Sequence, residues 1–249
     1  MNRYSALILA GSRPGGDPVA RAEGVGAKAL VDVAGQEMLS RVIAAVREAG
    51  ADRIGVVASD PDTIALAEAQ GCVIIPAASG PSESAARGFA ALGAPMLLTT
   101  SDHPLLQGQW IEDFRQTVQP TSDVAVLLAR RDVVEAAVPQ TQRTWLRFAD
   151  GEWSGCNLFL FRTPAAVAAF ALWQAVERDR KRPWRIVRRL GPGLLLRYLA
   201  GRLSLADAVA HLGRKAGVVV EALATPHGLA AVDVDKVEDL ALVRQILSR

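Results

Sequence analysis

A glycine-rich loop near the N-terminus is the first feature that could do chemistry. The apolar residues 6–10 lead into Gly11-Ser12-Arg13-Pro14-Gly15-Gly16-Asp17, and Lys28 follows. Glycine lets backbone amides approach phosphate oxygens closely, and such a turn aims several N–H donors at one anion. Arg13 and Lys28 would supply the positive charge that the amides lack. The stretch therefore predicts a polyphosphate site; the alternative is an ordinary strand-to-helix turn whose cations are solvated.

A carboxylate directly follows a second apolar run, residues 96–98. Asp102 lies in the sequence Thr99-Thr100-Ser101-Asp102-His103-Pro104, where a strand is expected to end. A carboxylate in this place can hold a hard divalent cation against nucleotide phosphates. The other interpretation of Asp102 is an N-cap for a helix that begins near Pro104. His103 belongs to the same turn, and the sequence offers it no partners at the spacing of a zinc site.

Two more carboxylates, Asp233 and Asp235, lie near the C-terminus in Ala231-Val232-Asp233-Val234-Asp235-Lys236-Val237-Glu238-Asp239-Leu240. In an extended segment their side chains point to the same face, because strand side chains repeat every two residues. One of them can therefore join Asp102 at a cation. The alternative is that both only cap the helix that is expected to start at Lys236.

These motifs resemble those of nucleotidyltransferases with a GT-A-like fold, in particular the MobA-like group that includes molybdenum-cofactor guanylyltransferase. In that family a strand ends in Leu-Ala-Gly, matched here by Leu9-Ala10-Gly11, and a loop with an arginine covers the triphosphate. A lysine then precedes a segment like residues 29–35. Ser12 replaces the usual second glycine, and the long loop carries Arg21 as well as Arg13. Either arginine is a candidate to face the departing phosphates.

The resemblance also implies which residues hold a metal ion. The aspartate of the family's Asp-x-Pro element is a metal ligand and matches Asp102. The family's closing element of two acidic or amide residues matches Asp233 and Asp235, although Lys236-Val237 replaces the usual Thr-Pro. The implied cofactor is Mg²⁺ or Mn²⁺ at Asp102 together with Asp233 or Asp235. By its place in the motif Asp233 is preferred, and Asp235 would then cap the last helix.

The nucleobase and the acceptor are assigned in the same way. In relatives the segment that matches residues 78–88 binds nucleobase and ribose through backbone groups and hydroxyls, which implies Ser79, Gly80 and Ser82; Ser82 as a simple N-cap is the alternative. The segment 154–162 resembles the acceptor side of the family and points to Asn157, which could instead have a structural role in a turn. The sequence does not identify the base.

Residues 178–189 carry seven cations and one acid. Three interpretations stay open for this basic segment and the apolar residues that follow it. It is a clamp for the acceptor phosphate that uses Arg185 and Arg188, a peripheral membrane contact through residues 178–199, or a helical cover whose cations pair with acidic side chains of the same chain.

The elements that must position these residues alternate between short apolar runs and amphipathic stretches. Strands are expected at 5–10, 53–58, 73–76, 96–100 and 124–128, helices at 38–49, 61–70 and 82–92, and two further strands at 144–148 and 157–161. This alternation is typical of parallel strands joined by right-handed crossover helices, with ligands at the carboxyl ends of the strands. We expect an α/β fold with a Rossmann-like, mostly parallel central sheet and flanking helices.

Composition sets outer limits. The 249 residues, half of them hydrophobic and 22% charged, predict one domain over 1–249, with a basic helical insertion at about residues 165–215. A net charge of +2 gives no reason to expect nucleic acid as a partner. No apolar run approaches the roughly eighteen residues of a membrane span. Two cysteines, Cys72 and Cys156, cannot form a disulfide framework, and the first residues do not resemble a signal peptide. A cytoplasmic location is therefore expected. If the basic segment contacts lipid, the protein would be peripheral at the inner face of the membrane.

Together the motifs predict the transfer of a nucleoside monophosphate from a nucleoside triphosphate to a phosphorylated acceptor, either a small molecule or a lipid-derived phosphate. Arg13, Lys28 and Asp102 would be the catalytic residues. Two alternatives stay open. A GT-A glycosyltransferase also uses an Asp-x-Asp pair, but it needs no triphosphate loop. A non-catalytic nucleotide-binding module would be expected to have lost one of the acidic motifs, and both are intact.

Overall fold

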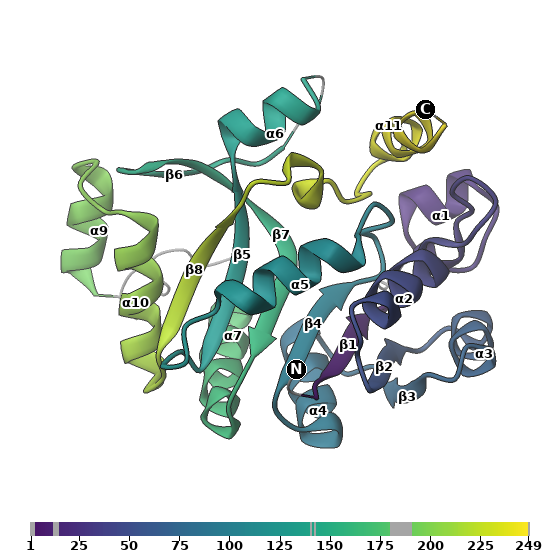
Figure 1. Ribbon diagram of the computed structural model, residues 1–249, viewed down its shortest axis with the longest axis horizontal. Coiled ribbons are helices and arrows are strands. Elements are labelled where there is room, and N and C mark those ends of the chain that lie inside the picture. Colours follow the sequence, from purple (N-terminus) through teal and green to yellow (C-terminus); the bar gives the residue numbers. More distant parts are fainter. Residues whose placement is uncertain (1–2, 12–14, 140, 142, 180–190, 249) are drawn as a thin grey trace.

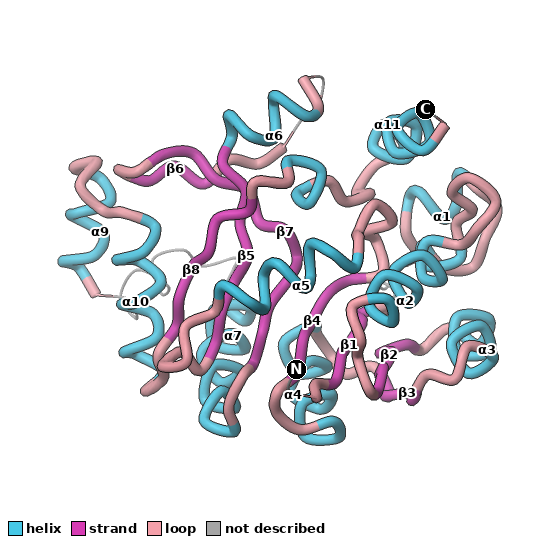
Figure 2. Tube along the Cα trace, in the orientation of Figure 1, coloured by secondary structure: helices cyan, strands magenta, loops and turns pink. Residues whose placement is uncertain are grey.

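The structure, a computed structural model, describes residues 3–11, 15–139, 141, 143–179 and 191–248. These residues form a mixed sheet of eight strands in the order β3-β2-β1-β4-β7-β5-β8, with β6 paired to β7. Helices cover both faces of the sheet (Figures 1 and 2). The predicted α/β fold with a mostly parallel central sheet and flanking helices is confirmed.

One strand runs against the others. The pairs β1–β2, β1–β4, β2–β3 and β5–β8 are parallel, whereas β7 is antiparallel to β4, β5 and β6. In chain order the strands are β1 Ser5–Leu9, β2 Arg53–Ala58, β3 Val73–Pro76, β4 Met96–Thr100, β5 Val124–Arg130, β6 Leu146–Phe148, β7 Gly151–Phe161 and β8 Val220–Thr225.

The α-helices are α1 Pro18–Ala22, α2 Met38–Glu48, α3 Pro61–Ala69, α4 Pro81–Leu92, α5 Gly108–Thr117, α6 Arg131–Ala137, α7 Val167–Asp179, α9 Pro192–Leu199, α10 Leu205–Ala216 and α11 Val237–Leu247. Short 3-10 helices lie at η1 Lys28–Leu30, η2 Pro164–Ala166 and η3 Gly228–Ala231. The predicted strands and helices of the first 130 residues agree with β1 to β5 and α2 to α4 to within two residues. The strand expected at 157–161 is the second half of β7, and β8 was missed.

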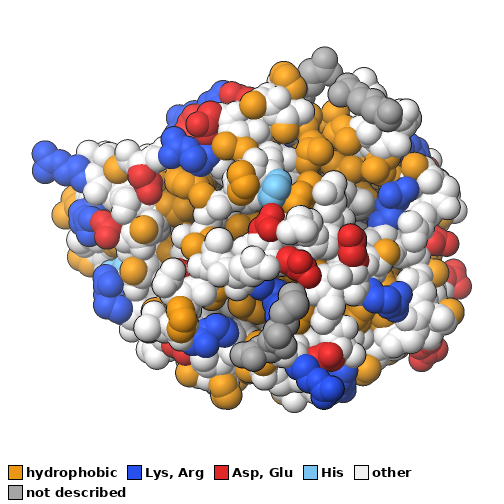
Figure 3. All heavy atoms as spheres, in the orientation of Figure 1, with side chains coloured by type: hydrophobic (Ala, Val, Ile, Leu, Met, Phe, Trp, Pro, Cys, Tyr) orange, Lys and Arg blue, Asp and Glu red, His pale blue; other side chains and the backbone are white. Residues whose placement is uncertain are grey.

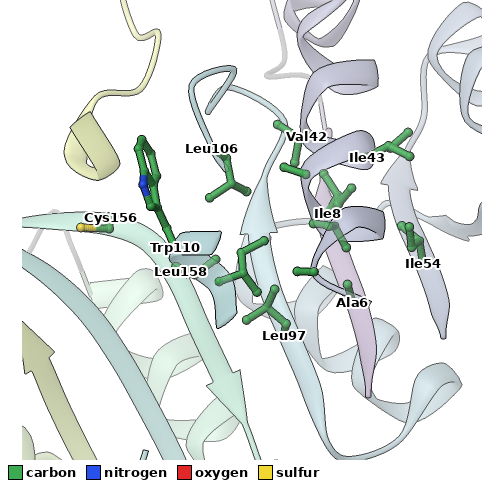
Figure 4. Packing of buried hydrophobic residues seen from close by; sticks show 14 of the residues in the cluster. Ala6, Ile8, Val42, Ile43, Ile54, Leu97, Leu106, Trp110, Cys156 and Leu158 are labelled. Carbon is green, nitrogen blue, oxygen red and sulfur yellow. The ribbon is translucent and has the colours of Figure 1, made fainter. Parts of the chain in front are cut away.

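Alternating side chains of the central strands build two separate cores. Ala6 and Ile8 of β1 face α2 and α5, whereas Leu7 faces α4 and α7 on the other side of the sheet. Figure 4 shows Ile8 and Leu97 directed toward side chains of α2 and α5. Because strand side chains alternate between faces, burial on both sides requires the nearly continuous apolar runs that made β1 and β4 easy to predict.

Helix α4 packs closely against β1 at Gly88. A Cβ atom built there would lie 2.6 Å from Leu7 Cδ1, and Leu7 is fully buried. We expect Gly88→Ala to destabilise the protein by about 1–2 kcal/mol, because the cost of overpacking exceeds the gain in helix propensity. Gly193→Ala in α9 is the control, since a Cβ there meets nothing within 4 Å. Urea unfolding of both variants measures the difference; equal stabilities would contradict the close approach.

Three of the helices, α7, α9 and α10, lie in the range where a basic helical insertion was expected. Figure 1 shows α9 and α10 at one side of the molecule, next to β8. Residues 180–190, which include most of the basic segment 178–189 and both Arg185 and Arg188, lie outside the described residues. In the described ranges, no helix has the length and apolar composition needed to cross a bilayer.

Candidate active site

The candidate active site lies where β1, β4 and β8 end at one edge of the sheet. β1 leads into the glycine-rich loop, β4 leads to Asp102, and β8 leads through η3 to residues 233–235. A backbone hydrogen bond from Val234 N to Asp102 O (2.9 Å) joins the last two segments. Carboxylates from the middle and the end of the chain therefore lie side by side.

Lys28 lies between two of these carboxylates. Its Nζ is 2.7 Å from Asp102 Oδ2 and 3.7 Å from Asp235 Oδ1, and it donates to the carbonyl of Val234 at 2.9 Å. Burial alone would raise the pKa of Asp102, but the charge and hydrogen bond of Lys28 outweigh it and hold this pKa below its usual 3.8. Burial likewise opposes the charge on Lys28, yet Asp102 raises the Lys28 pKa above its usual value. Both groups are charged at neutral pH.

Asp233 is held by two side chains from the second half of the chain. The Arg143 guanidinium donates to Asp233 Oδ1, and Asn157 Nδ2 donates to Asp233 Oδ2 at 2.7 Å. The side chains of Arg143 and Asp233 are 9% and 14% exposed. Burial raises the pKa of Asp233 above its usual value; Arg143 opposes this shift, and the nearby charges of Asp102 and Asp235 add to it. The carboxylates repel one another, so the cluster would gain from further positive charge.

A strand irregularity delivers Asn157 to this cluster. The pairing of β5 with β7 shifts register between Val126–Phe159 and Leu128–Gly155, and Asn157 lies within that bulge. Its φ of 49° is in the left-handed region, which asparagine tolerates better than most residues. Bulges often redirect a side chain at a functional site. The structure thus brings Asn157 to the predicted metal ligands, while its contact with an acceptor stays a prediction.

Asp102 does not cap a helix. The next helix, α5, begins at Gly108 rather than near Pro104, and its N-cap is Gln107. The cap interpretation of Asp102 is wrong, because the residues between Pro104 and Gln107 form turns first. His103, which follows Asp102, is buried, and burial lowers its pKa to about 4. It is neutral at neutral pH and adds no charge to the site.

The expected cap of the last helix is also wrong. α11 begins at Val237, with Lys236 as its N-cap. The carboxylate that accepts from the backbone amides of Asp235 and Lys236 belongs to Asp239, at 3.0 and 2.9 Å. Asp239 thus supplies the hydrogen bonds assigned to Asp235, because it stands three residues into the helix and reaches back. The Asp235 side chain, 57% exposed, remains beside Lys28.

One observation indicates that these carboxylates fit a hard divalent cation. Asp102 Oδ1 is buried and makes no hydrogen bond of ordinary distance and angle among the residues described, although the nearby Thr100 hydroxyl helps to lower the Asp102 pKa. Such an oxygen is costly to leave unpaired, and carboxylate oxygens are the preferred ligands of Mg²⁺ and Mn²⁺. Within the described part of the chain, no three His, Cys, Asp or Glu side chains are already gathered around one ion position; Lys28 and Arg143 lie among the carboxylates instead. Asp102 with Asp233 or Asp235 stays the predicted ligand set.

The predicted nucleobase segment lies at the start of α4. The N-cap of α4 is Gly80, so the interpretation of Ser82 as the N-cap is wrong. Ser82 donates through its hydroxyl and its backbone amide (3.1 Å) to Glu177 of α7. A side chain at position 80 would collide with Glu177, and Ser79 Oγ donates to Glu83 at 2.6 Å. That Ser79, Gly80 and Ser82 bind a nucleotide stays a prediction.

The start of the glycine-rich loop is in place at the end of β1. The carbonyl of Leu9 accepts from Ser101 N at 3.0 Å, Ala10 is buried, and Gly11 is exposed. Arg21 Nη1 donates back to the carbonyl of Gly15 at 2.8 Å. Ser12 and Arg13 lie outside the described residues, so the choice between Arg13 and Arg21 stays open.

Two residues at the site were missed by sequence reasoning. Arg143 lies between α6 and β6, in a stretch without a regular apolar pattern, and Glu177 lies in the amphipathic helix α7. No motif or spacing marks either residue. Only the fold could reveal them, because it brings the β5–β7 connection and the end of α7 to the edge where β1, β3 and β4 end.

One family model and several solved structures match this chain. Residues 6–218 match the family model described as the MobA-like NTP transferase domain. A solved structure described as a hypothetical transferase from Thermus thermophilus is 32% identical, with a TM-score of 0.83, over 96% of this chain and 100% of that chain. Among curated proteins no match is found.

Two more distant structures share the fold. A CMP:2-keto-3-deoxy-manno-octonic acid synthetase in complex with CTP is 15% identical, with a TM-score of 0.62 over 99% of both chains. A 4-diphosphocytidyl-2C-methyl-D-erythritol synthase from Anaerococcus prevotii is 12% identical, with a TM-score of 0.60 over 100% of this chain and 99% of that chain. At these identities the likeness extends to the fold alone.

Proposed function

Because the chain belongs to the MobA-like NTP transferase domain family, we propose that it is a nucleotidyltransferase that transfers a nucleoside monophosphate from a nucleoside triphosphate to a phosphorylated acceptor. The observation that carries this proposal is the 2.7 Å contact of Lys28, which follows the glycine-rich loop, with Asp102, which follows β4. A lysine and a carboxylate cluster at this edge of the sheet suit a triphosphate and a divalent cation. Mg²⁺ or Mn²⁺ is part of the proposal.

The residues divide the work as follows. Asp102 and Asp233 would hold the cation, which supplies charge neutralisation at the phosphates. Lys28 binds the β- and γ-phosphates and stabilises the charge that develops on departing pyrophosphate. An oxygen of the acceptor phosphate attacks the α-phosphorus, and the bond from that phosphorus to the bridging oxygen of the β-phosphate breaks. The attacking oxygen is already anionic, so the step needs no strong general base.

A glycosyltransferase that uses a nucleotide sugar is the second candidate, because Asp233 and Asp235 form an Asp-x-Asp pair. The contact of Asp235 with Lys28, which follows the glycine-rich loop, favours a triphosphate over a nucleotide sugar. Two proteins of the same fold have names that include CTP or a cytidylyl product. CTP is therefore tested first, beside GTP, ATP and UTP.

The test is incubation of the purified protein with each nucleoside triphosphate, Mg²⁺ and a pool of phosphorylated metabolites. We expect release of pyrophosphate with one triphosphate, dependent on the metabolite pool and on Mg²⁺. Heat-denatured protein and a pool treated with phosphatase are the controls. Release of nucleoside diphosphate from nucleotide sugars, without any pyrophosphate from triphosphates, would overturn the proposal in favour of glycosyl transfer. Binding without any turnover would favour a regulatory module.

A further inference from the structure

Arg143 places a largely buried positive charge in the carboxylate cluster, where it pairs with Asp233, whereas Lys28 pairs with Asp102 and Asp235. The Arg143 side chain is 9% exposed, and its hydrogen bonds within the described ranges go to Asp233, at Oδ1 and, more weakly, at the carbonyl oxygen (3.4 Å). Burying the Arg143 guanidinium costs hydration free energy, and the ion pair with Asp233 offsets that cost only if its geometry is good.

The two cations come from different halves of the chain. Lys28 follows the glycine-rich loop and contacts Asp102 and Asp235, whereas Arg143 belongs to the connection between β5 and β7 and contacts Asp233. Asn157 of β7 contacts the same carboxylate at 2.7 Å. In the proposed reaction two anions must meet at this cluster, the triphosphate and the acceptor phosphate. With Lys28 on the triphosphate side, the acceptor side has Arg143.

Guanidinium chemistry suits a phosphate. Its planar fork donates two parallel N–H bonds to a carboxylate or to a phosphate with the same geometry, which an ammonium cannot do. In the structure one terminal nitrogen of this fork donates to the Asp233 carboxylate and the other donates to the Asp233 carbonyl oxygen at 3.4 Å. An acceptor phosphate must approach three carboxylates, Asp102, Asp233 and Asp235, that repel it. Lys28 neutralises part of this charge at Asp102 and Asp235, and Arg143 is in position to offset the repulsion at Asp233.

A cavity next to this pair has room for the rest of an acceptor. It has a volume of about 650 Å³ and is lined by Thr141, by Lys236 and by a face of α11 that includes Glu238, Asp239 and Ala241. Neither Arg143 nor Asp233 lines it. Thr141 precedes Arg143 by two residues, and Lys236 follows Asp233 by three. The cavity is thus bounded by the two segments that carry the Arg143–Asp233 pair. Figure 3 shows hydrophobic side chains gathered on the surface between α6 and α11.

We propose that Arg143 binds the phosphate of the acceptor and that this cavity receives the group esterified to it, an inference that rests on the proposed function. The ligand class is a phosphomonoester. Arg143 then has the role that sequence reasoning gave to Arg185 and Arg188, although those two residues lie outside the described part of the chain and the two assignments can be tested separately.

The experiment is calorimetric titration of the full-length protein with inorganic phosphate and with phenyl phosphate. Each titration is done with Mg²⁺ and a saturating α,β-methylene analogue of the nucleoside triphosphate. We expect Arg143→Gln to weaken the binding of both phosphates at least about tenfold, since a charge-assisted bidentate contact is lost. Binding of the triphosphate analogue should change by less than about threefold, because Arg143 contacts Asp233 and Lys28 contacts Asp102 and Asp235.

Two variants serve as matched controls. Lys28→Gln should show the reverse pattern, weak binding of the triphosphate analogue and normal binding of phosphate to the nucleotide-free protein. Arg147→Gln removes the same charge from a side chain that is 77% exposed on β6 and should change neither. If Arg143→Gln fails to fold, Arg143→Lys tests the proposal, because lysine keeps the positive charge but lacks the planar pair of N–H donors. We expect Arg143→Lys to bind phosphate more weakly than the wild type as well.

The outcomes separate this inference from the proposed function. Phosphate binding that is unchanged in the Arg143 variants, or lacking in the wild type at millimolar concentration, overturns the inference and leaves nucleotidyl transfer standing. A wild type that binds phosphate but no triphosphate analogue sinks the proposed function instead. For the cavity, Ala241→Trp should weaken phenyl phosphate and leave inorganic phosphate unchanged. Equal binding of phenyl phosphate by Ala241→Trp and wild type would remove the cavity from the proposal.

Discussion

Asp102→Asn is expected to lower the rate of pyrophosphate release at least about a hundredfold while the protein stays folded. Enzymes commonly lose this much when one group that stabilises transition-state charge is removed. The substitution keeps the shape of the side chain but removes the anionic charge that a hard cation requires. Lys28 keeps its bond to the carbonyl of Val234, so we expect a loss of only about 1–3 kcal/mol in the free energy of unfolding.

Turnover is measured as pyrophosphate release at saturating Mg²⁺, and folding by circular dichroism and urea unfolding. Asp132→Asn is the matched control, since the Asp132 side chain is 71% exposed and pairs only with Arg130 in the described structure. Asp233→Asn and Asp235→Asn, compared side by side, identify the second ligand. Near-normal turnover of Asp102→Asn would show that Asp102 is not part of the site. Small, equal losses of turnover in Asp233→Asn and Asp235→Asn would show that the C-terminal motif does not hold the cation.

Lys28→Met is expected to damage both catalysis and stability. Loss of a charge-assisted contact to the departing phosphates should lower kcat/KM at least about tenfold. The variant also leaves the buried Asp102 carboxylate without its partner, which typically costs about 3–5 kcal/mol. Lys215→Met, at an exposed position near the end of α10, is the control. Unchanged kcat/KM in Lys28→Met would place Lys28 in a purely structural role.

The stability loss in Lys28→Met should depend on pH. In the wild type Lys28 holds the pKa of Asp102 below its unfolded value near 3.8, so the pair stabilises the fold above that value. This contribution is lost as the pH falls through the folded pKa, because Asp102 then becomes protonated. The difference in unfolding free energy between wild type and Lys28→Met should be largest at neutral pH and shrink below about pH 4. A difference that is constant over pH would exclude this ion pair as its source.

Much of the fold could be predicted because the buried parallel strands have unambiguous sequences. β1 and β4 are covered on both faces and contain the apolar runs 6–9 and 96–98, and the glycine-rich loop and the turn with Asp102 follow soon after. The first half of β7 and all of β8 were harder. β7 begins Gly-Glu-Trp-Ser-Gly, and β8 is an edge strand that includes Glu221, so neither has a continuous apolar run.

The candidate site divides in the same way. Lys28, Asp102, Asp233 and Asp235 were predicted together from motifs, and the structure brings them together. Arg143 was not predicted, because its position follows from the long-range pairing of β7 between β4 and β5 and from no local pattern. The register shift at Asn157 is likewise a property of two strands, since it depends on how β5 and β7 pair.

The reversed strand β7 has a consequence for how such a site can change over time. β7 enters the sheet at the edge where β1, β4, β5 and β8 end, so the connection before it brings Arg143 to the site, and α7 after it starts at the opposite edge. Surface connections accept insertions and substitutions more readily than strands do. The connection that carries Arg143 can therefore change while Lys28 and Asp102, which follow β1 and β4, stay the same. If the proposed function holds, a reversed strand of this kind lets the acceptor side of the site change independently of the triphosphate side.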